Sequence, residues 1–210
     1  QHQAQLAVSA IYDVVTKIDT KVREQPGEGM QQLRLDVLDD TRERMDSILE
    51  SAKGSATFNR TAAALEQHAG DVYKELGRTE EAVEHYEKCR ETIEAMAGED
   101  PDNDANIFNL AVVYEKLGSV TLELEDIAVA REHHRKSLDL RIRLTQLTIT
   151  DPRLTPEKVK ESLAGAYLTQ AGLASALGDP AGAWEFLSRY LEIQEAVRYS
   201  IPREFLSAIE

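Results

Sequence analysis

Cysteine is almost absent from this 210-residue chain, which contains only Cys89. A single thiol cannot form an internal disulfide, so the fold must be stabilised by its own core. Aromatic residues make up only 6% of the chain, and there are six prolines. No apolar run approaches the roughly 18 residues of a membrane-spanning helix. These absences exclude a disulfide scaffold and predict no membrane segment within this sequence.

Positive charge is also scarce, because 24 Lys and Arg residues face 38 Asp and Glu residues, which gives a net charge of −14. Nucleic acids and anionic membrane surfaces require a concentrated positive face on their partner. We therefore expect neither as a main partner. The simplest interpretation of the acidic surface is that it keeps the protein soluble. The more specific alternative is that it binds a basic peptide.

Motifs for catalysis and for metal or phosphate binding are missing as well. The chain has no glycine-rich phosphate loop, no kinase catalytic motif and no nucleophile elbow. No Glu-x-x-His pair is present, and the adjacent His133 and His134 diverge by about 100° on a helix. We expect no enzymatic activity, no metal and no cofactor.

Helix-forming residues dominate what remains, and they predict an all-α fold. Breaks at Gly and Pro divide the chain into about eight helices. Thr79, Thr155 followed by Pro156, and Asp179 each have the character of a helix N-cap. The expected helices cover about residues 2–24, 30–52, 56–76, 80–97, 104–124, 126–149, 156–177 and 180–197.

Three segments share one spacing of small and larger residues. Ala82, Ala130 and Ala183 are 48 and then 53 residues apart. Each lies in a unit whose six landmarks follow one another at +3, +7, +12, +16 and +19 from the first. The three units are Gly70, Tyr73, Gly77, Ala82, Tyr86, Cys89; Gly118, Thr121, Glu125, Ala130, His134, Ser137; and Ala171, Ala174, Gly178, Ala183, Leu187, Tyr190.

A rival register pairs Gly77 with Gly118, 41 residues apart. It requires a seven-residue insertion before Ala130, whereas the 48-residue register requires none, so we prefer the latter. Small residues at the first and fourth landmarks allow two antiparallel helices to approach closely. The residues expected to pack the repeats are Gly70, Tyr73, Ala82, Tyr86, Gly118, Ala130, Ala171 and Ala183.

This pattern resembles the tetratricopeptide repeat over about residues 56–197. The units are near 50 residues long, compared with 34 in the standard repeat. In the second unit Glu125 replaces the usual turn glycine and His134 replaces the usual aromatic residue, which leaves open how tightly this hairpin turns. Long units of this kind, with phrases such as Leu110–Gly118 and Ser137–Leu144, also resemble repeat regions of multidomain serine/threonine protein kinases of planctomycete-type bacteria.

The resemblance implies an α-solenoid of antiparallel helical hairpins with a right-handed superhelix. We expect a divergent N-terminal hairpin that caps the array at 1–55, three repeat hairpins at 56–197, and a tail or short helix at 198–210. Because the chain begins with Gln1 and not Met, we expect it to be a fragment of a larger protein, with a kinase as one candidate neighbour.

In such repeats the first helix of each hairpin lines the concave groove. Mixed polar and apolar residues occupy those positions, without the cluster of Lys and Asn that would clamp a peptide carboxylate. Gly165 and Gly172 leave the seventh helix bare, for another helix or for a ligand backbone. The candidate partner-binding residues are Gln67, Asp71, Lys74, Glu75, Glu115, Ser119, Leu122, Leu168 and Gly172.

We therefore expect a scaffold that binds a protein or peptide partner on its concave face. The first alternative is self-association into a homo-oligomer that clusters attached domains. The second is a domain that senses a small ligand. The compartment stays open between the cytoplasm, which we favour, and an extracytoplasmic part of an anchored protein.

Overall fold

A computed structural model describes residues 56–200, together with residues 20, 27, 29, 31–37 and 40. Within these residues there are six long helices and no strand. A shorter helical stretch covers residues 31–37. The helix expected at 2–24, most of the helix expected at 30–52 and most of the tail expected at 198–210 lie outside the described residues, and residues 198–200 continue the helix that begins at Pro180. The all-α fold class is confirmed for the part described.

The described residues belong to two compact units. The first contains those up to Asp100 together with Ser119–Asp126, and the second contains Pro101–Gly118 and the residues from Ile127 onward. The boundary therefore passes through one helix, between Gly118 and Ser119.

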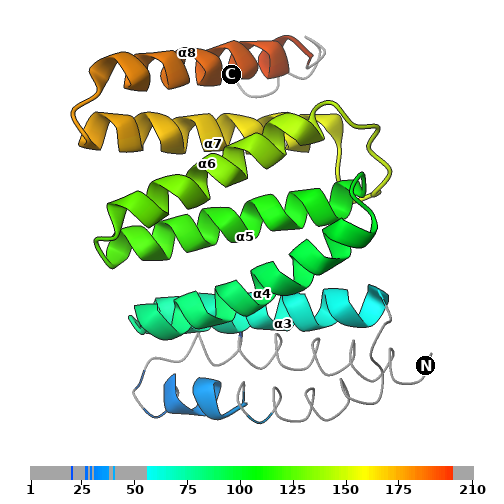
Figure 1. Cartoon of the computed structure of the whole chain (residues 1–210), viewed down its shortest axis with the longest axis vertical. Helices are drawn as coiled ribbons and strands as arrows, with labels where there is room; N and C mark the ends of the chain where they lie inside the picture. Colours follow the sequence, from blue (N-terminus) through cyan, green and yellow to red (C-terminus); the bar gives the residue numbers. More distant parts are fainter. Residues whose placement is uncertain are drawn as a thin grey trace. The chain divides into compact units, whose positions relative to one another are not determined.

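In the first unit, helices α3 (Ala56–Glu75) and α4 (Thr79–Glu99) pack as an antiparallel hairpin (Figure 1). The expected Thr79 cap is wrong. Arg78 is the N-cap residue and makes no side-chain capping bond; its guanidinium pairs instead with Glu81 at 2.6 Å. Helix α4 also continues through Gly98, where the sequence pattern predicted a break.

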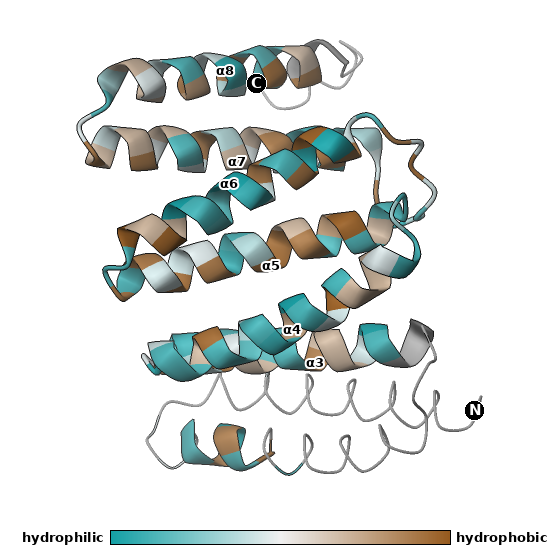
Figure 2. Ribbon diagram, viewed as in Figure 1, coloured by the Kyte–Doolittle hydropathy of each residue, from teal (hydrophilic) through white to brown (hydrophobic). Residues whose placement is uncertain are grey.

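Helix α5 (Asp104–Glu123) is followed by α6 (Ile127–Leu144). Figure 2 shows that α5 is the more hydrophobic of the two and that α6 is predominantly hydrophilic. The predicted end of α6 near Ile149 is wrong by five residues. Beyond Leu144 the chain forms turns, and the N–H groups of Thr150 and Asp151 bind the Asp104 carboxylate.

The second unit also contains α7 (Pro156–Ala176) and α8 (Pro180–Ser200), which pack against each other as an antiparallel hairpin. Both predicted caps are confirmed. The Thr155 hydroxyl accepts from the Lys158 N–H at 3.1 Å, and Asp179 accepts from the Gly182 N–H at 2.9 Å. Helices α6 and α7 also pack together, around a core of Leu138, Leu163 and Ala166.

The turns that follow α3, α5 and α7 have one backbone geometry. Gly77, Glu125 and Gly178 have φ values of 72°, 63° and 75°. In each turn this residue donates its N–H three residues back, and the next residue donates five residues back, as in a Schellman motif. The middle hairpin is closed by the same bonds as the others, although its left-handed residue is a glutamate.

This agreement confirms the 48-residue register and excludes the 41-residue alternative. Under the alternative, Gly118 would lie in a turn, but it lies within α5 and is buried. Glu125 is the residue that matches Gly77. A non-glycine residue is disfavoured in this conformation by roughly 1 kcal/mol, and the hairpin forms in spite of that cost.

Candidate partner-binding surface

Two of the predicted repeat positions, Gly70 and Gly118, are places where the helices of a hairpin approach each other closely. A Cβ atom placed on Gly70 would lie 2.5 Å from the Tyr86 ring, and one on Gly118 would lie 2.6 Å from the His134 ring. Both approaches join the first landmark to the fifth in their units. No side chain larger than hydrogen fits at either glycine without displacing a buried ring.

The other residues expected to pack the repeats differ in burial. Ala82 and Ala130 are completely buried. Tyr73 and Ala171 are also buried, with 6% and 7% of their surface exposed. Ala183, on the last helix, is only half-buried. The alanine positions are thus enclosed in the first two repeats and more open in the third.

Tyr86 closes the first hairpin through its hydroxyl group. The ring is 1% exposed, and the hydroxyl donates to the Asp71 carboxylate at 2.6 Å. Burial, together with the bond to Asp71, raises the pKa of Tyr86 far above its usual range. Asp71, a candidate partner-binding residue, is therefore already bound to the interior of its own hairpin.

His134 occupies the same position in the second hairpin with different chemistry. The imidazole is 5% exposed. Burial lowers the pKa of His134, and the nearby Glu115 carboxylate only partly opposes that effect. The ring is consequently held in its neutral form, and it fills the space above Gly118.

The α3 candidates are involved in ion pairs within the first unit. Glu75 accepts from the buried Arg34 guanidinium at 2.9 Å. Lys74 pairs with Glu123, at the end of α5, at 3.2 Å. This pair brings α3 beside the last turn of α5, where Leu122 is 40% exposed.

Glu115, the first α5 candidate, belongs to a polar network in the second unit. Its carboxylate accepts from the guanidinium of Arg141, a residue only 4% exposed. Arg141 also donates to Ser137 at 2.5 Å and to Ser162 of α7 at 2.7 Å. The network therefore connects α5, α6 and α7 through one buried side chain.

The α7 candidates are the most accessible. Leu168 is 48% exposed, and Gly172 is exposed as well. A Cβ atom on Gly165 or Gly172 would meet no atom within 4 Å. No helix among the described residues packs against these glycines, and the approach of a ligand backbone stays a prediction.

The candidate set therefore includes both internally bonded charges and accessible apolar groups. Gln67 and Ser119 are half-buried on α3 and α5. The candidates up to Glu75, with Ser119 and Leu122, belong to the first unit, and Glu115, Leu168 and Gly172 belong to the second. The structure brings Lys74 and Leu122 into one neighbourhood through Glu123.

Sequence reasoning missed the buried polar groups. Arg34, Asp104 and Arg141 are each less than 10% exposed and hydrogen-bonded. The alignment of the repeats offered one signal for Arg141. It lies 48 residues after Ile93, which is buried, so the equivalent position in the next unit is expected to be buried too. Nothing comparable in the sequence marked Asp104 or Arg34.

No group of three or more His, Cys, Asp or Glu side chains in the described part of the chain is arranged to hold a metal ion. None of the described helices is long and apolar enough to cross a membrane.

Comparison with known protein families identifies a tetratricopeptide repeat at residues 67–91. This segment contains all six landmarks of the first unit and the close contact between Gly70 and Tyr86. No curated protein sequence matches the chain.

Solved structures of helical repeats resemble the chain over most of its length. The crystal structure of BtubC (BKLC) from P. vanneervenii matches with a TM-score of 0.57 at 20% identity, over 93% of this chain and 81% of that one. The de novo designed helical repeat protein DHR64 matches with a TM-score of 0.50 at 13% identity, over 94% of each chain. At these identities the likeness concerns the fold, and with the matched repeat it establishes a TPR-like, all-α solenoid.

Proposed function

We propose that this chain is a protein-interaction module that binds a peptide or protein partner along the first helices of its hairpins. The observation that carries the proposal is the contrast on those helices between charges that are already paired and apolar groups that are accessible. Asp71, Glu75 and Glu115 are bonded internally, whereas Leu122 and Leu168 are 40% and 48% exposed.

Such a surface suits binding through a few apolar contacts surrounded by polar groups. Burying a leucine side chain contributes about 1.5–3 kcal/mol, whereas an exposed ion pair contributes at most about 1 kcal/mol. The exposed Lys74–Glu123 pair lies beside Leu122 and would form part of the polar rim. Gly172 leaves room for a partner backbone near Leu168.

The experiment is affinity capture from a lysate of the source organism with the wild-type chain and with a Lys74→Glu, Leu122→Asp variant. The matched control is Lys88→Glu with Val129→Asp, which makes the same charge change on exposed residues of α4 and α6. Proteins retained by the wild type and the control but lost by the first variant would support the surface. Equal capture by all three would contradict it.

Self-association is a second candidate, favoured by the last helix. Trp184 and Leu191 on α8 are 67% and 48% exposed and lie seven residues apart, on one face of the helix. Sedimentation of the wild type and of a Trp184→Glu, Leu191→Glu variant tests this candidate. A concentration-dependent oligomer that the substitutions abolish would support it, and a monomer at every concentration would eliminate it.

The wider organisation is also part of the proposal. A capping hairpin at 1–55, a binding array at 56–197 and a tail at 198–210 would act as a non-catalytic module of a larger bacterial protein. The resemblance of the long repeat units to those of multidomain kinases supports a kinase as the attached domain. Limited proteolysis should then cleave near residues 55 and 198 before it cleaves within the array.

A further inference from the structure

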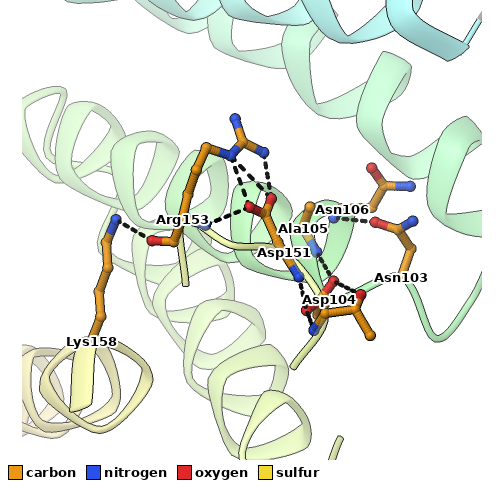
Figure 3. A network of polar contacts seen from close by, with 8 residues as sticks. Asn103, Asp104, Ala105, Asn106, Asp151, Arg153 and Lys158 are labelled. Carbon is orange, nitrogen blue, oxygen red and sulfur yellow. Dashed lines mark hydrogen bonds and ion pairs between the residues drawn. The ribbon is translucent and has the colours of Figure 1, made fainter. Parts of the chain in front are cut away.

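The loop between α6 and α7, residues 145–155, is held in place from beneath by Asp104. This carboxylate is 2% exposed and accepts from the Asp151 N–H at 2.8 Å, from the Thr150 N–H and from the Thr150 hydroxyl at 3.1 Å (Figure 3). Burial alone would raise the pKa of Asp104, but these donors and the Ala105 N–H together hold it below its ordinary value. The loop is therefore attached to the start of α5 by a charged group.

Further bonds fix the far end of the same loop. Arg153 binds Asp151 through its side chain, and its carbonyl accepts from the Lys158 ammonium at 3.2 Å (Figure 3). Thr155 then caps α7. A loop of this length would ordinarily be free to move. Here its middle is hydrogen-bonded to α5, and its far end is hydrogen-bonded to α7.

This fixed loop encloses one side of an aliphatic pocket in the second unit. The pocket has a volume of about 330 Å³. Leu144, Leu154 and Val159 are the buried walls, Leu147 and Ile149 of the loop are half-buried, and Pro156 is exposed at the edge. Its size lies at the lower end of the range for small-molecule sites.

Two polar side chains lie in the lining. The Thr145 hydroxyl is satisfied, because it donates to the Ile142 carbonyl at 2.7 Å. Lys160 is exposed and forms no ion pair or hydrogen bond with another of the residues that the structure describes. The pocket thus combines aliphatic walls with one uncompensated positive charge, in a chain whose net charge is −14.

We propose that this pocket binds a small aliphatic carboxylate, with its alkyl chain against the leucine, isoleucine and valine side chains and its carboxylate on Lys160. A peptide segment fits the lining less well, because its backbone amides would need partners on burial. The loop N–H groups of Thr150 and Asp151 are already occupied by Asp104. The proposal is independent of the partner-binding surface, since the two share no residue.

Octanoate is the probe, titrated into the full chain while the methyl NMR signals of its Leu, Ile and Val residues are followed. Saturable shifts should be confined to methyl groups such as those of Leu147, Ile149 and Val159. Across hexanoate, heptanoate and octanoate the affinity should rise about fourfold for each added methylene, since each buried CH₂ adds a constant increment. Octanol, which has the same chain without the charge, should bind several-fold more weakly.

Variants separate the charge from the shape of the pocket. Lys160→Glu should weaken octanoate roughly fivefold to tenfold while leaving octanol unchanged, and Lys160→Arg should restore binding. Lys88→Glu, on α4 in the first unit, makes the same charge change and should have no effect. Thr145→Phe, which fills the pocket from its exposed edge, should abolish shifts for both probes while the thermal midpoint is kept.

Three results would overturn the proposal. The first is an absence of saturable methyl shifts with octanoate. The second is equal binding of octanoate and octanol, or an unchanged octanoate affinity in Lys160→Glu. The third is tighter binding of an acetylated leucine-rich peptide than of octanoate at the same methyl groups, which would assign the pocket to a protein partner.

Discussion

Helices α4 and α6 hold equivalent positions in successive repeat units, and most of the matched buried positions carry different residues in the two helices. At intervals of 48 residues, Ala82 is matched by Ala130, Tyr86 by His134, and Cys89 by Ser137. Ile93, 5% exposed, is matched by Arg141, 4% exposed. At these matched positions α6 is therefore the more polar helix, although α4 also buries His85 and α6 also buries Leu138 and Leu144.

The comparison shows that position in the repeat determines burial, while the neighbours determine which chemistry is tolerated. Ile93 requires only apolar contact. Arg141 requires acceptors for its donors, and Glu115, Ser137 and Ser162 supply them from three helices. Polar groups are stable at such a buried position only when each of them has a hydrogen-bond partner.

The largest effect should come from removing Arg141. Arg141→Ala removes packing and leaves its acceptors without their donor, so we expect a loss of about 2–4 kcal/mol in the free energy of unfolding. Urea denaturation measures this loss. Arg141→Ile, which copies Ile93 of α4, should cost less than half as much, because it keeps the volume and Glu115 can return to water. A greater loss for isoleucine than for alanine would contradict the equivalence of the two helices.

The two close glycines provide the next test. Gly70→Ala and Gly118→Ala gain about 1 kcal/mol in helix propensity but force a methyl group into a buried ring. We expect a net destabilisation of about 1–2 kcal/mol for each in urea denaturation. Gly165→Ala is the matched control, because that helical glycine is open, and it should stabilise by about 1 kcal/mol. Similar values for all three would refute the close approach.

Because His134 takes the place of Tyr86 in the second hairpin, its titration should make the free energy of unfolding depend on pH. Its folded-state pKa is lowered by burial, so the unfolded chain takes up the proton first, near pH 6.5. Stability from the neutral ring is complete above that pH and is lost as the pH falls toward the folded-state pKa, by at most about 1.4 kcal/mol per pH unit. His134→Phe should reduce the fall in unfolding free energy between pH 7 and pH 5. An identical fall in both proteins would show that His134 is not buried in its neutral form.

Much of this fold could be predicted from the sequence, because helix periodicity and breakers are local signals. The spacing of small residues also indicated close approach of the helices at Gly70 and Gly118, since close approach excludes large side chains. It did not indicate that the rings of Tyr86 and His134 would face these glycines within each hairpin. The end of α6 could not be found in this way. It depends on the capture of Thr150 and Asp151 by Asp104, which is 46 residues earlier than Thr150 in the sequence.

The candidate surface was harder to predict for a related reason. Periodicity indicates which face of a helix a residue occupies, but not whether its charge is already paired. Glu75 and Glu115 carry charges that the arginines at 34 and 141 compensate, through contacts 41 and 26 residues apart in the sequence. The aliphatic pocket arises from the turns after α6, which the sequence pattern treated as helix.

The smallest expected effect tests the central claim most directly, namely that the hairpins repeat one backbone geometry despite their different residues. Glu125 has the left-handed conformation of Gly77 and Gly178. Glu125→Gly should therefore raise the free energy of unfolding by about 1 kcal/mol relative to Glu125→Ala, which removes the same charge, and Gly77→Ala should lower it by a similar amount. Urea denaturation of these three variants and the wild type decides the matter. A Glu125→Gly variant that is no more stable than Glu125→Ala would contradict the shared geometry.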